Sequence, residues 1–382
     1  MDKPVVSAVR CGDYDQERVE QSLRRALEGL GGMGRFVKPG MRVYIKPNAL
    51  GKRRPEEYIT THPAVVAAAA KLAFEAGAGE VLIGDCPGGS GADARIEDIY
   101  EVCGYAGVAA SVGARLVVNK TRAVREVPGG VSAKSFDLVE EMVSSDLLIN
   151  ISKAKTHQLC SFTGAVKNLY GTIYGRDKQK YHAIYPMPPA FNQFLIDIAE
   201  TVKPGLNIMD AVVGIEGPGP AAGYPRKLGA LLASASPYAL DAAAVDLIGW
   251  PQSDVMLLGL ARKRGLLPER LEDIQMVGDP PAELRAKRPF QKPTVTAQAT
   301  LRFARMLPRP LREAAQARPR LIPEKCVGCG ECAAACPPRA IAMLAKKPVI
   351  DYNKCIKCFC CHELCPEKAL EVRRGFFNSN PK

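Results

Sequence analysis

The sequence predicts an α/β protein whose N-terminal domain is a mostly parallel, doubly wound sheet, followed by a small cysteine-rich α+β domain. Short apolar runs alternate with helical segments along the first part of the chain, which is typical of a sheet covered by helices on both faces. The other two observations concern composition. Residues 1–282 carry 32 Lys and Arg against 32 Asp and Glu, whereas residues 283–382 carry 20 against 8. Nine of the 13 cysteines lie between Cys326 and Cys365.

These shifts in composition predict an α/β domain over 1–282, a basic Pro- and Arg-rich linker over 283–320, and a cysteine-rich domain over 321–382. Two interpretations of the linker are open. It is a solvated segment packed against the body, or it is a site for a membrane surface or an acidic partner.

Composition also excludes several classes of protein. The chain is 47% hydrophobic and 24% charged, which is ordinary for a globular protein. No apolar run reaches the roughly 18 residues of a membrane span, and the first residues lack the apolar core of a signal peptide. We therefore expect a cytoplasmic protein with reduced thiols, where clustered cysteines indicate metal binding rather than disulfides. Basic charge without a recognition motif does not support a nucleic-acid partner.

The elements of the N-terminal domain follow in order along the chain. Apolar runs predict strands at 5–9, 42–45, 80–84, 116–118, 147–151 and 206–209. Helical spacing predicts helices at 15–30, 61–77, 96–103, 191–202 and 237–248. Gly31 and Gly32 form a plausible C-terminal cap for the first helix, and Thr61 with Pro63 is a typical start for the second.

Polar and charged residues follow four of the predicted strands. In open parallel sheets, ligands bind in the crevice at the carboxyl ends of the strands. The candidates there are Lys46 and Asn48 after one strand, Asp85 after the next, Lys153, Lys155 and His157 after a third, and Asp210 and Glu216 after a fourth. The Gly-rich run at 88–91 is as consistent with an ordinary loop as with a phosphate cradle. There is no dinucleotide-binding fingerprint and no Walker A sequence.

Lys153, Lys155 and His157 lie within a short segment, and Lys167 and Asn168 follow it. Such a cationic cluster is costly unless it faces solvent or an anion, so we expect an anionic small molecule in the crevice. Lys46, Lys153 and Lys155 are the candidates for holding the anion. His157 or His182 is the candidate proton donor, although a single histidine is more often structural. Asp85, Asp210 and Glu216 are the candidates for orienting the ligand or accepting a proton.

These motifs together resemble the family called domain of unknown function 362. The matching segments are 45–48, 60–63, 83–85, 150–157, 163–171, 181–182 and 210–219, within about residues 40–250. Members of this family often carry a ferredoxin module at one end, and the resemblance implies no settled reaction. A fainter similarity to the N-terminal domain of lactate racemases covers 46–48 and 61–63, and we do not extend it to nickel-cofactor chemistry.

The cysteines form two runs with the spacing C-x2-C-x2-C-x3-C-P, which is typical of bacterial [4Fe–4S] ferredoxins. In two-cluster ferredoxins the fourth cysteine of each run binds the other cluster. This resemblance implies one cluster on Cys326, Cys329, Cys332 and Cys365, and a second on Cys355, Cys358, Cys361 and Cys336. The alternative is zinc bound by Cys-x2-Cys pairs. Cys360 does not fit the spacing and is interpreted as a non-ligand beside a cluster.

The sequence therefore predicts an iron–sulfur protein of electron transport that functions under anaerobic conditions. The first hypothesis is an oxidoreductase that passes electrons between two [4Fe–4S] clusters and an anionic ligand or cofactor in the crevice. The alternative is a ferredoxin-type carrier whose N-terminal domain docks a partner enzyme, and a protein acting on nucleic acid is a third. We expect a redox partner such as a ferredoxin, flavodoxin or reductase. No flavin motif is readable, and the sequence determines neither an additional organic cofactor nor the oligomeric state.

Overall fold

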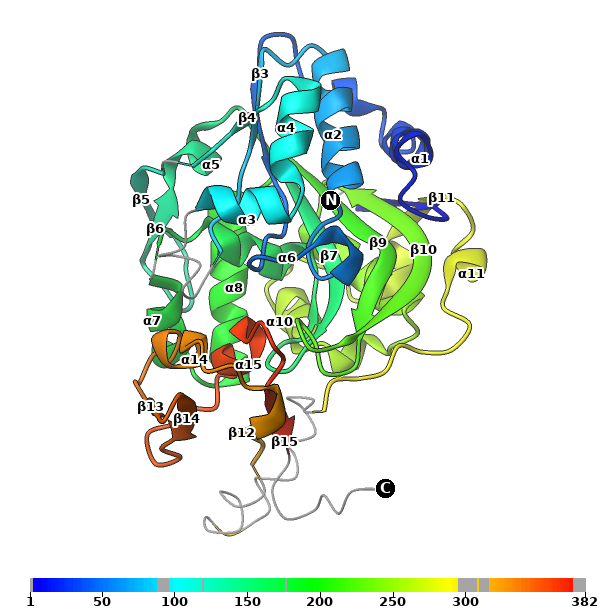
Figure 1. Cartoon of the computed structure of the whole chain (residues 1–382). Helices are drawn as coiled ribbons and strands as arrows, with labels where there is room; N and C mark the ends of the chain where they lie inside the picture. The colour runs from blue at the N-terminus through cyan, green and yellow to red at the C-terminus, as the bar shows by residue number, and fades with distance from the viewer. Residues whose placement is uncertain are drawn as a thin grey trace.

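The computed structural model describes residues 3–87, 96–118, 120–175, 177–294, 308 and 316–373. These form a large α/β body and a smaller C-terminal unit that packs below it in Figure 1. The Gly-rich run at 88–91 and most of the predicted linker, including its apolar residues at 301–307, lie outside the described residues. In the described part of the chain, no helix has both the length and the apolar character needed to cross a membrane.

A nine-stranded sheet with the order β11-β1-β10-β9-β7-β2-β3-β4, to which β8 adds beside β7, forms the centre of the body. Its strands are β1 (Val5–Arg10), β2 (Arg42–Lys46), β3 (Glu80–Ile83), β4 (Arg115–Leu116), β7 (Leu147–His157), β8 (Ser161–Thr163), β9 (Leu206–Glu216), β10 (Tyr224–Ser234) and β11 (Gln275–Gly278). The pairs β1–β11, β2–β3, β2–β7, β3–β4 and β7–β9 are parallel, which confirms the predicted sheet. The unpredicted β10 runs antiparallel between β1 and β9. A separate antiparallel pair joins β5 (Arg122–Glu126) to β6 (Ser135–Val139).

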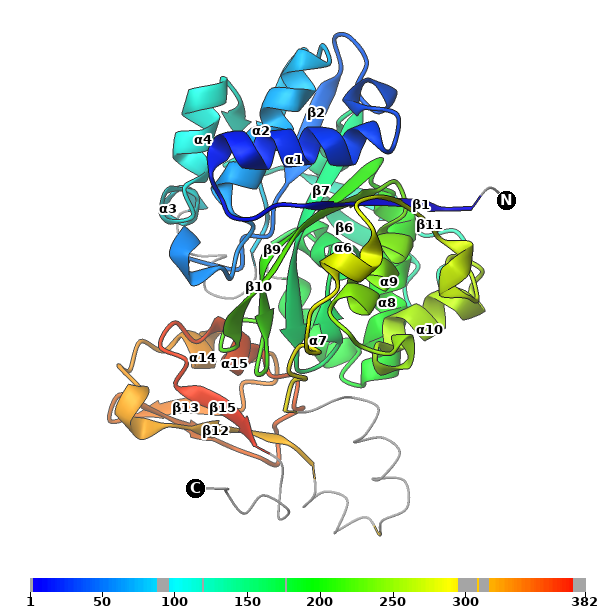
Figure 2. The same ribbon diagram turned by 90° about the vertical axis from the view of Figure 1, so that its right-hand side faces the viewer.

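Helices cover both faces of the sheet, as Figure 2 shows. One face carries α1 (Gln16–Glu28), α2 (Pro63–Glu75), α3 (Ile96–Val102) and α4 (Tyr105–Val112). The other carries α5 (Glu140–Ser144), α6 (Ala165–Asn168), α7 (Asp177–Ile184), α8 (Pro188–Val202), α9 (Pro237–Leu247), α10 (Met256–Lys263) and α11 (Pro281–Leu284). The two-sided covering confirms the doubly wound arrangement.

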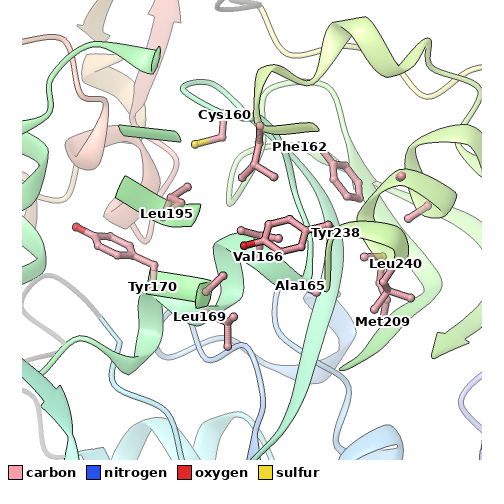
Figure 3. Packing of buried hydrophobic residues seen from close by; sticks show 14 of the residues in the cluster. Cys160, Phe162, Ala165, Val166, Leu169, Tyr170, Leu195, Met209, Tyr238 and Leu240 are labelled. Atoms are coloured by element: carbon pink, nitrogen blue, oxygen red, sulfur yellow. The ribbon is translucent and has the colours of Figure 1, made fainter. Parts of the chain in front are cut away.

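Alternating residues of the same strands fill the two cores. Val43 and Ile45 pack with the apolar residues of α1 and α2, whereas Tyr44 between them belongs to the core on the opposite face. This alternation follows from the pleat of the strand. Figure 3 shows the second core, where Ala165 and Val166 of α6 lie beside side chains of α9. The short helix α6 is therefore fixed by packing rather than by its own length.

The strands β7 and β9 are longer than the sequence pattern predicted, because pairing with neighbouring strands extends their hydrogen-bond ladders. Antiparallel β8 pairs with the end of β7 through His157, and β10 pairs with β9 through Glu216. Lys153, Lys155 and His157 were expected after the end of the predicted strand but lie within β7, at alternate positions of a fully buried strand. A period of two places them on one face of the sheet.

The start of α2 also differs from the prediction. His62 is its N-cap, and its ring nitrogen accepts a hydrogen bond from the backbone N–H of Ala64. Thr61, the expected cap, instead accepts from the N–H of Asn48 and donates to the carbonyl of Ile151. Thr61 therefore links the segments that follow β2 and the middle of β7, both of which contribute to the site.

The C-terminal unit contains two short antiparallel pairs and two short helices. Its elements are β12 (Arg318–Leu321), α14 (Glu331–Ala334), β13 (Ile341–Leu344), β14 (Lys347–Ile350), α15 (Cys360–Leu364) and β15 (Leu370–Arg373). β12 pairs with β15, and β13 pairs with β14. In Figure 2 the helices α14 and α15 face the body, while the strands lie farther from it. This α+β arrangement confirms the second part of the predicted fold.

Candidate functional site

The first polar pair lies where β2 and β3 end. Lys46 and Asp85 are both buried, and the Lys46 Nζ lies 2.7 Å from the Asp85 Oδ1. The carboxylate also accepts from the backbone N–H groups of Ala49 and Cys86. Burial lowers the pKa of Lys46, although Asp85 opposes this shift. Gly171 passes directly over the pair, since a Cβ there would lie 2.4 Å from the Lys46 Nζ.

A second buried pair joins β7 to β9. The Lys153 Nζ lies 2.8 Å from the Asp210 Oδ2 and donates to the hydroxyl of Tyr14 at 2.7 Å. The Tyr14 hydroxyl donates to the other Asp210 oxygen at 2.8 Å, and the backbone N–H of His62 donates to Oδ2. The His62 ring stacks on Tyr14 with the ring centroids 3.8 Å apart. Asp210 is therefore fully engaged in holding Lys153.

Lys155 has a different environment, because its neighbours are neutral oxygens. Its Nζ donates to the Asn48 Oδ1 at 2.5 Å and to the carbonyl of Ile59 at 2.9 Å. Burial, followed by the charges of Lys167 and Lys153, lowers the pKa of Lys155 to about 7. A buried ammonium group without a counter-charge loses its proton readily, because burial destabilises its charged form.

A chain of buried amides begins at Lys155 and crosses the sheet. The Asn48 amide donates to Asn168 at 3.0 Å, Asn168 donates to Asn150 at 2.8 Å, and Asn150 donates to Asn207 at 2.9 Å. The last amide donates to the carbonyl of Ala235 at 3.2 Å. In each amide of this chain, the oxygen lies on the side that leads back to Lys155. The chain therefore fixes the Asn48 Oδ1 as the acceptor for Lys155, and it polarises the Asn48 amide.

His157 connects the body to the C-terminal unit. Its Nδ1 accepts from the backbone N–H of Leu159 at 3.0 Å, and its Nε2 lies 2.7 Å from the Glu363 Oε1. Burial lowers the pKa of His157 to about 4, so the neutral ring with a proton on Nε2 fits both contacts. Burial alone would raise the pKa of Glu363, but His157 and Lys167 lower it overall.

Two further contacts hold the C-terminal unit against the body. Arg53 donates to the carbonyls of Cys365 and Pro366, each at 3.1 Å. The His362 Nε2 lies 3.1 Å from the carbonyl of Pro218. With the His157 contact, these place α15 and the end of the second cysteine run directly over the crevice.

An outer cavity lies between the body and α15. Its wall includes the predicted residues Lys46, Asn48, Asp85, Lys167, Asn168 and His182, together with Tyr170, Gly171, Lys178, Cys360, Glu363 and Leu364. His182 of α7 is buried against Phe191, with the two ring centroids 4.5 Å apart. Burial lowers the pKa of His182 to about 3, so at neutral pH the ring is uncharged.

A smaller inner cavity adjoins the outer one. Its wall includes the predicted residues Asn48, Lys153, Lys155, His157, Lys167 and Asn168, together with Leu50, Thr163, Gly164, Pro220 and Glu363. Asn48, Leu50 and Lys167 line both cavities. Asp241 stabilises the part of this wall at the start of α6, because its carboxylate accepts hydrogen bonds from the backbone N–H groups of Ala165 and Val166.

Two predicted residues lie outside both cavities. Asp210 holds Lys153, as described above. Glu216 pairs with Arg226 at 3.1 Å and with Arg288 at 3.2 Å, and it accepts from the backbone N–H of Gln291. These contacts fasten the segment after β11 to the end of β9. In the structure, Asp210 therefore holds the side chain of Lys153, and Glu216 holds the segment after β11 against the end of β9.

The ferredoxin resemblance assigned Cys326, Cys329, Cys332 and Cys365 to one cluster, and these four residues line a common cavity. Burial and then neighbouring thiols raise the pKa of Cys361, namely Cys358, Cys355 and Cys336 of its own predicted set and Cys332 of the other. These donor sets fit the thiolate ligation of a [4Fe–4S] cluster. In the described residues, no three His, Cys, Asp or Glu side chains converge closely enough to bind a single metal ion.

Each predicted set contains two buried cysteines. Cys358, Cys360 and Cys361 are buried, whereas Cys329 is exposed and the adjacent Val327 is 65% exposed. Cys360 begins α15 and lines the outer cavity, so it stands between the second cysteine set and the crevice. A hydrogen bond with Cys358 and then burial raise the pKa of Cys360 well above its ordinary value.

The sequence reasoning missed several residues of the site. Asn150 and Asn207 each interrupt an apolar strand, and an isolated amide in such a run is a usable signal. Cys360 was predicted beside a cluster but not in the crevice, and Glu363 gave no signal, because nothing local shows that α15 closes the crevice. Lys178 of α7 lines the outer cavity. It lies in a polar segment of the sequence, whose pattern does not distinguish a site residue from an exposed one.

Comparisons with known proteins agree with this architecture. Residues 43–246 match the family described as domain of unknown function (DUF362), and residues 318–366 match the 4Fe-4S dicluster domain. The second match supports iron–sulfur clusters in the C-terminal unit and a role in electron transfer.

The thylakoid-associated protein sll1697 of Synechocystis sp. (strain ATCC 27184 / PCC 6803 / Kazusa) is 35% identical over 268 residues, which are 70% of this chain and 81% of that protein. Among solved structures, the lactate racemase apoprotein of Thermoanaerobacterium thermosaccharolyticum has a TM-score of 0.39 at 13% identity, over 65% of this chain and 57% of that one. A protein from Thermotoga maritima has a TM-score of 0.35 at 15% identity, over 54% and 52%. The chain thus spans little more than half the length of these two structures. By its matched residues and its relative, the chain belongs to the DUF362 family.

Proposed function

We propose that this protein is an oxidoreductase that passes electrons between two iron–sulfur clusters and a small anionic ligand in the crevice. The single observation that carries the proposal is the position of Cys360 and Glu363 in the wall of the outer cavity, opposite Lys46 and His182. The helix α15, which lies within the second cysteine run, is thereby part of the ligand site.

Two [4Fe–4S] clusters would supply one-electron chemistry, held by Cys326, Cys329, Cys332 and Cys365 and by Cys355, Cys358, Cys361 and Cys336. The backbone N–H groups of Ala340 and Ala369 donate to the sulfurs of Cys336 and Cys365, each at 3.2 Å. Such bonds stabilise thiolate charge and raise the reduction potential of a bound cluster. The exposed Cys329 of the first set suits exchange with a redox partner, and Cys358 and Cys361 of the second set, which lie beside the cavity-lining Cys360 in the sequence, suit exchange with the crevice.

The body's residues would bind and orient the ligand. Lys46 and Asp85 form a neutral polar floor, and the uncharged His182 offers a ring nitrogen with no hydrogen-bond partner among the described residues. His157 would hold a proton on Nε2 beside Glu363. The contact of α15 with the body restricts water in the cavity, which strengthens electrostatic interactions there.

A chemical test separates this proposal from its alternative, a carrier with no reaction of its own. Fully reduced, anaerobically purified protein is mixed with a panel of small acceptors, including 2-oxo acids and 2-enoic acids, and with a flavodoxin. Leu50 lines both cavities, so Leu50→Trp is expected to slow oxidation by the effective small acceptor about tenfold or more, with the flavodoxin rate unchanged.

Leu344→Trp is the matched control, because Leu344 is 61% exposed on the C-terminal unit. If no small acceptor oxidises the protein, or if Leu50→Trp leaves every rate unchanged, the oxidoreductase proposal is wrong. The carrier alternative is favoured by the exposed Cys329 and Val327, and it predicts that only the protein acceptor reacts. Mass spectrometry of molecules retained after anaerobic purification would identify an additional organic cofactor.

A further inference from the structure

Among the described residues, four buried lysines line the two cavities, Lys46 and Lys178 the outer one and Lys153 and Lys155 the inner one. Lys46 pairs with Asp85 and Lys153 pairs with Asp210, at 2.7 and 2.8 Å. Lys155 is 2% exposed and donates only to neutral oxygens, with no carboxylate paired to it in the part of the chain that the structure describes. Because a buried charge without a partner is unfavourable, this difference calls for a counter-charge.

The inner cavity offers space for that counter-charge. Lys155 lines it together with Lys167, and the one carboxylate in its wall, Glu363, is already held by His157 at 2.7 Å. The amide chain that ends in Asn48 prevents this side chain from turning its amide N–H group toward Lys155. The wall therefore presents two ammonium groups that the described residues do not neutralise directly.

We propose that the inner cavity binds the carboxylate of a small organic acid through Lys155 and Lys167. A single negative charge fits better than a phosphate dianion, because Glu363 lies in the same wall and repels additional charge. Asn48, Leu50 and Lys167 line both cavities, so the rest of such an acid extends toward Cys360 and His182 in the outer one. This assignment names the chemical class of the ligand. It rests on the proposed function for the reaction that the ligand undergoes.

The ionisation of Lys155 gives the site an independent signature. Its pKa of about 7, which results first from burial and then from Lys167 and Lys153, should rise when a carboxylate binds. Binding just above neutral pH should therefore take up a proton from solution. The other titratable groups that act on Lys155 or face the cavity are Lys153, Lys167, His157, Glu363 and Asp85.

The test uses the anaerobically purified full chain with its clusters. Equilibrium dialysis with [14C]acetate at constant ionic strength measures binding, with acetamide as a neutral competitor of similar shape and inorganic phosphate as a dianionic one. We expect saturable acetate binding at one site per chain, no competition by acetamide and weaker competition by phosphate. Lys155→Met should raise the Kd for acetate about tenfold or more, and calorimetry in two buffers should show proton uptake only in the wild type.

Lys167→Met is a second variant at a partly exposed position, and it should raise the Kd in the same direction, so the proposal stays testable if Lys155→Met does not fold. Lys71→Met is the matched control, since Lys71 is an exposed lysine paired with Glu20. Equal acetate binding by the wild type and both cavity variants, tighter binding of phosphate, or no saturable binding would overturn the proposal. Acetate is not reduced in this assay, so its outcome is independent of whether the protein transfers electrons to a ligand.

Discussion

The body and the C-terminal unit form opposite walls of the outer cavity, and they hold their side chains in different ways. On the body side, Asp85 holds Lys46 and accepts hydrogen bonds from the backbone N–H groups of Ala49 and Cys86. On the C-terminal side, α15 is attached through a few polar contacts, chiefly those of Glu363 and Arg53.

This difference suggests that the wall on the body is formed during folding, whereas the other wall is docked onto it. Buried ion pairs stabilise little relative to apolar packing but are strongly destabilising when one partner is lost. Contacts between domains are smaller and more polar, so they separate at lower free energy than a core. Perturbing the body should therefore reduce global stability, and perturbing the interface should open the cavity locally.

The largest expected effect is on the buried pair of β7 and β9. Asp210→Ala leaves the Lys153 ammonium buried without its partner and should lower the free energy of unfolding by about 3–5 kcal/mol. Anaerobic urea denaturation followed by fluorescence measures this loss. The control, Asp98→Ala, removes an exposed partner of Lys52 and should change stability by less than about 1 kcal/mol. Similar losses for both variants would contradict the idea of a preformed wall.

The next effect is a dependence of stability on pH that comes from Lys155. In the unfolded chain this lysine keeps its proton up to its ordinary pKa of 10.5, but in the folded chain it loses it near 7. The unfolded state binds more protons between these values, so stability should rise with pH there, by up to about 1.4 kcal/mol per pH unit. Denaturation of the wild type and Lys155→Met at several pH values would show this slope only in the wild type. Equal slopes would mean that Lys155 does not titrate in this range.

A smaller effect is expected where the chain passes over Lys46 and Asp85. Gly171→Ala would place a Cβ 2.4 Å from atoms of both side chains and should cost about 1–3 kcal/mol of stability. Gly107→Ala in α4 is the control, because nothing lies within 4 Å of its Cβ, and it should stabilise by about 0.5–1 kcal/mol. A neutral result for Gly171→Ala would show that this wall adapts, contrary to the preformed arrangement.

The smallest global effect should come from the interface. Arg53→Leu removes the donors to the carbonyls of Cys365 and Pro366 and should leave the unfolding of the body unchanged within about 0.5 kcal/mol. Amide hydrogen exchange within α15 should nevertheless accelerate about 5–30-fold, which corresponds to about 1–2 kcal/mol of local opening. If exchange accelerates equally in the central strands, the C-terminal unit is an integral part of the fold rather than a docked wall.

Much of the body could be predicted from sequence because its signals are local. The strands at Arg42–Lys46 and Glu80–Ile83 and the helix Pro188–Val202 follow apolar runs and helical spacing. The ends of β7 and β9 could not be predicted this way. Their continuation depends on pairing with β8 and β10, and a ladder between distant segments leaves no mark at His157 or Glu216. Asp85 and Asp210 are also far in sequence from Lys46 and Lys153, so these pairs could not be predicted either.

The sequence by itself determined the cysteine module and its internal repeat. Cys355 follows Cys326 by 29 positions, and the structure repeats the left-handed backbone of Gly328 and Gly330 at Lys357 and Phe359. Ligand spacing within one run is set by short-range geometry, so a local pattern is sufficient to identify it. Only the tertiary structure decided that Cys360 lines the crevice, and that Lys155, unlike Lys46 and Lys153, has no carboxylate paired with it among the described residues. Those facts depend on contacts between residues far apart in the chain, whose energies arise from burial and charge rather than from local sequence.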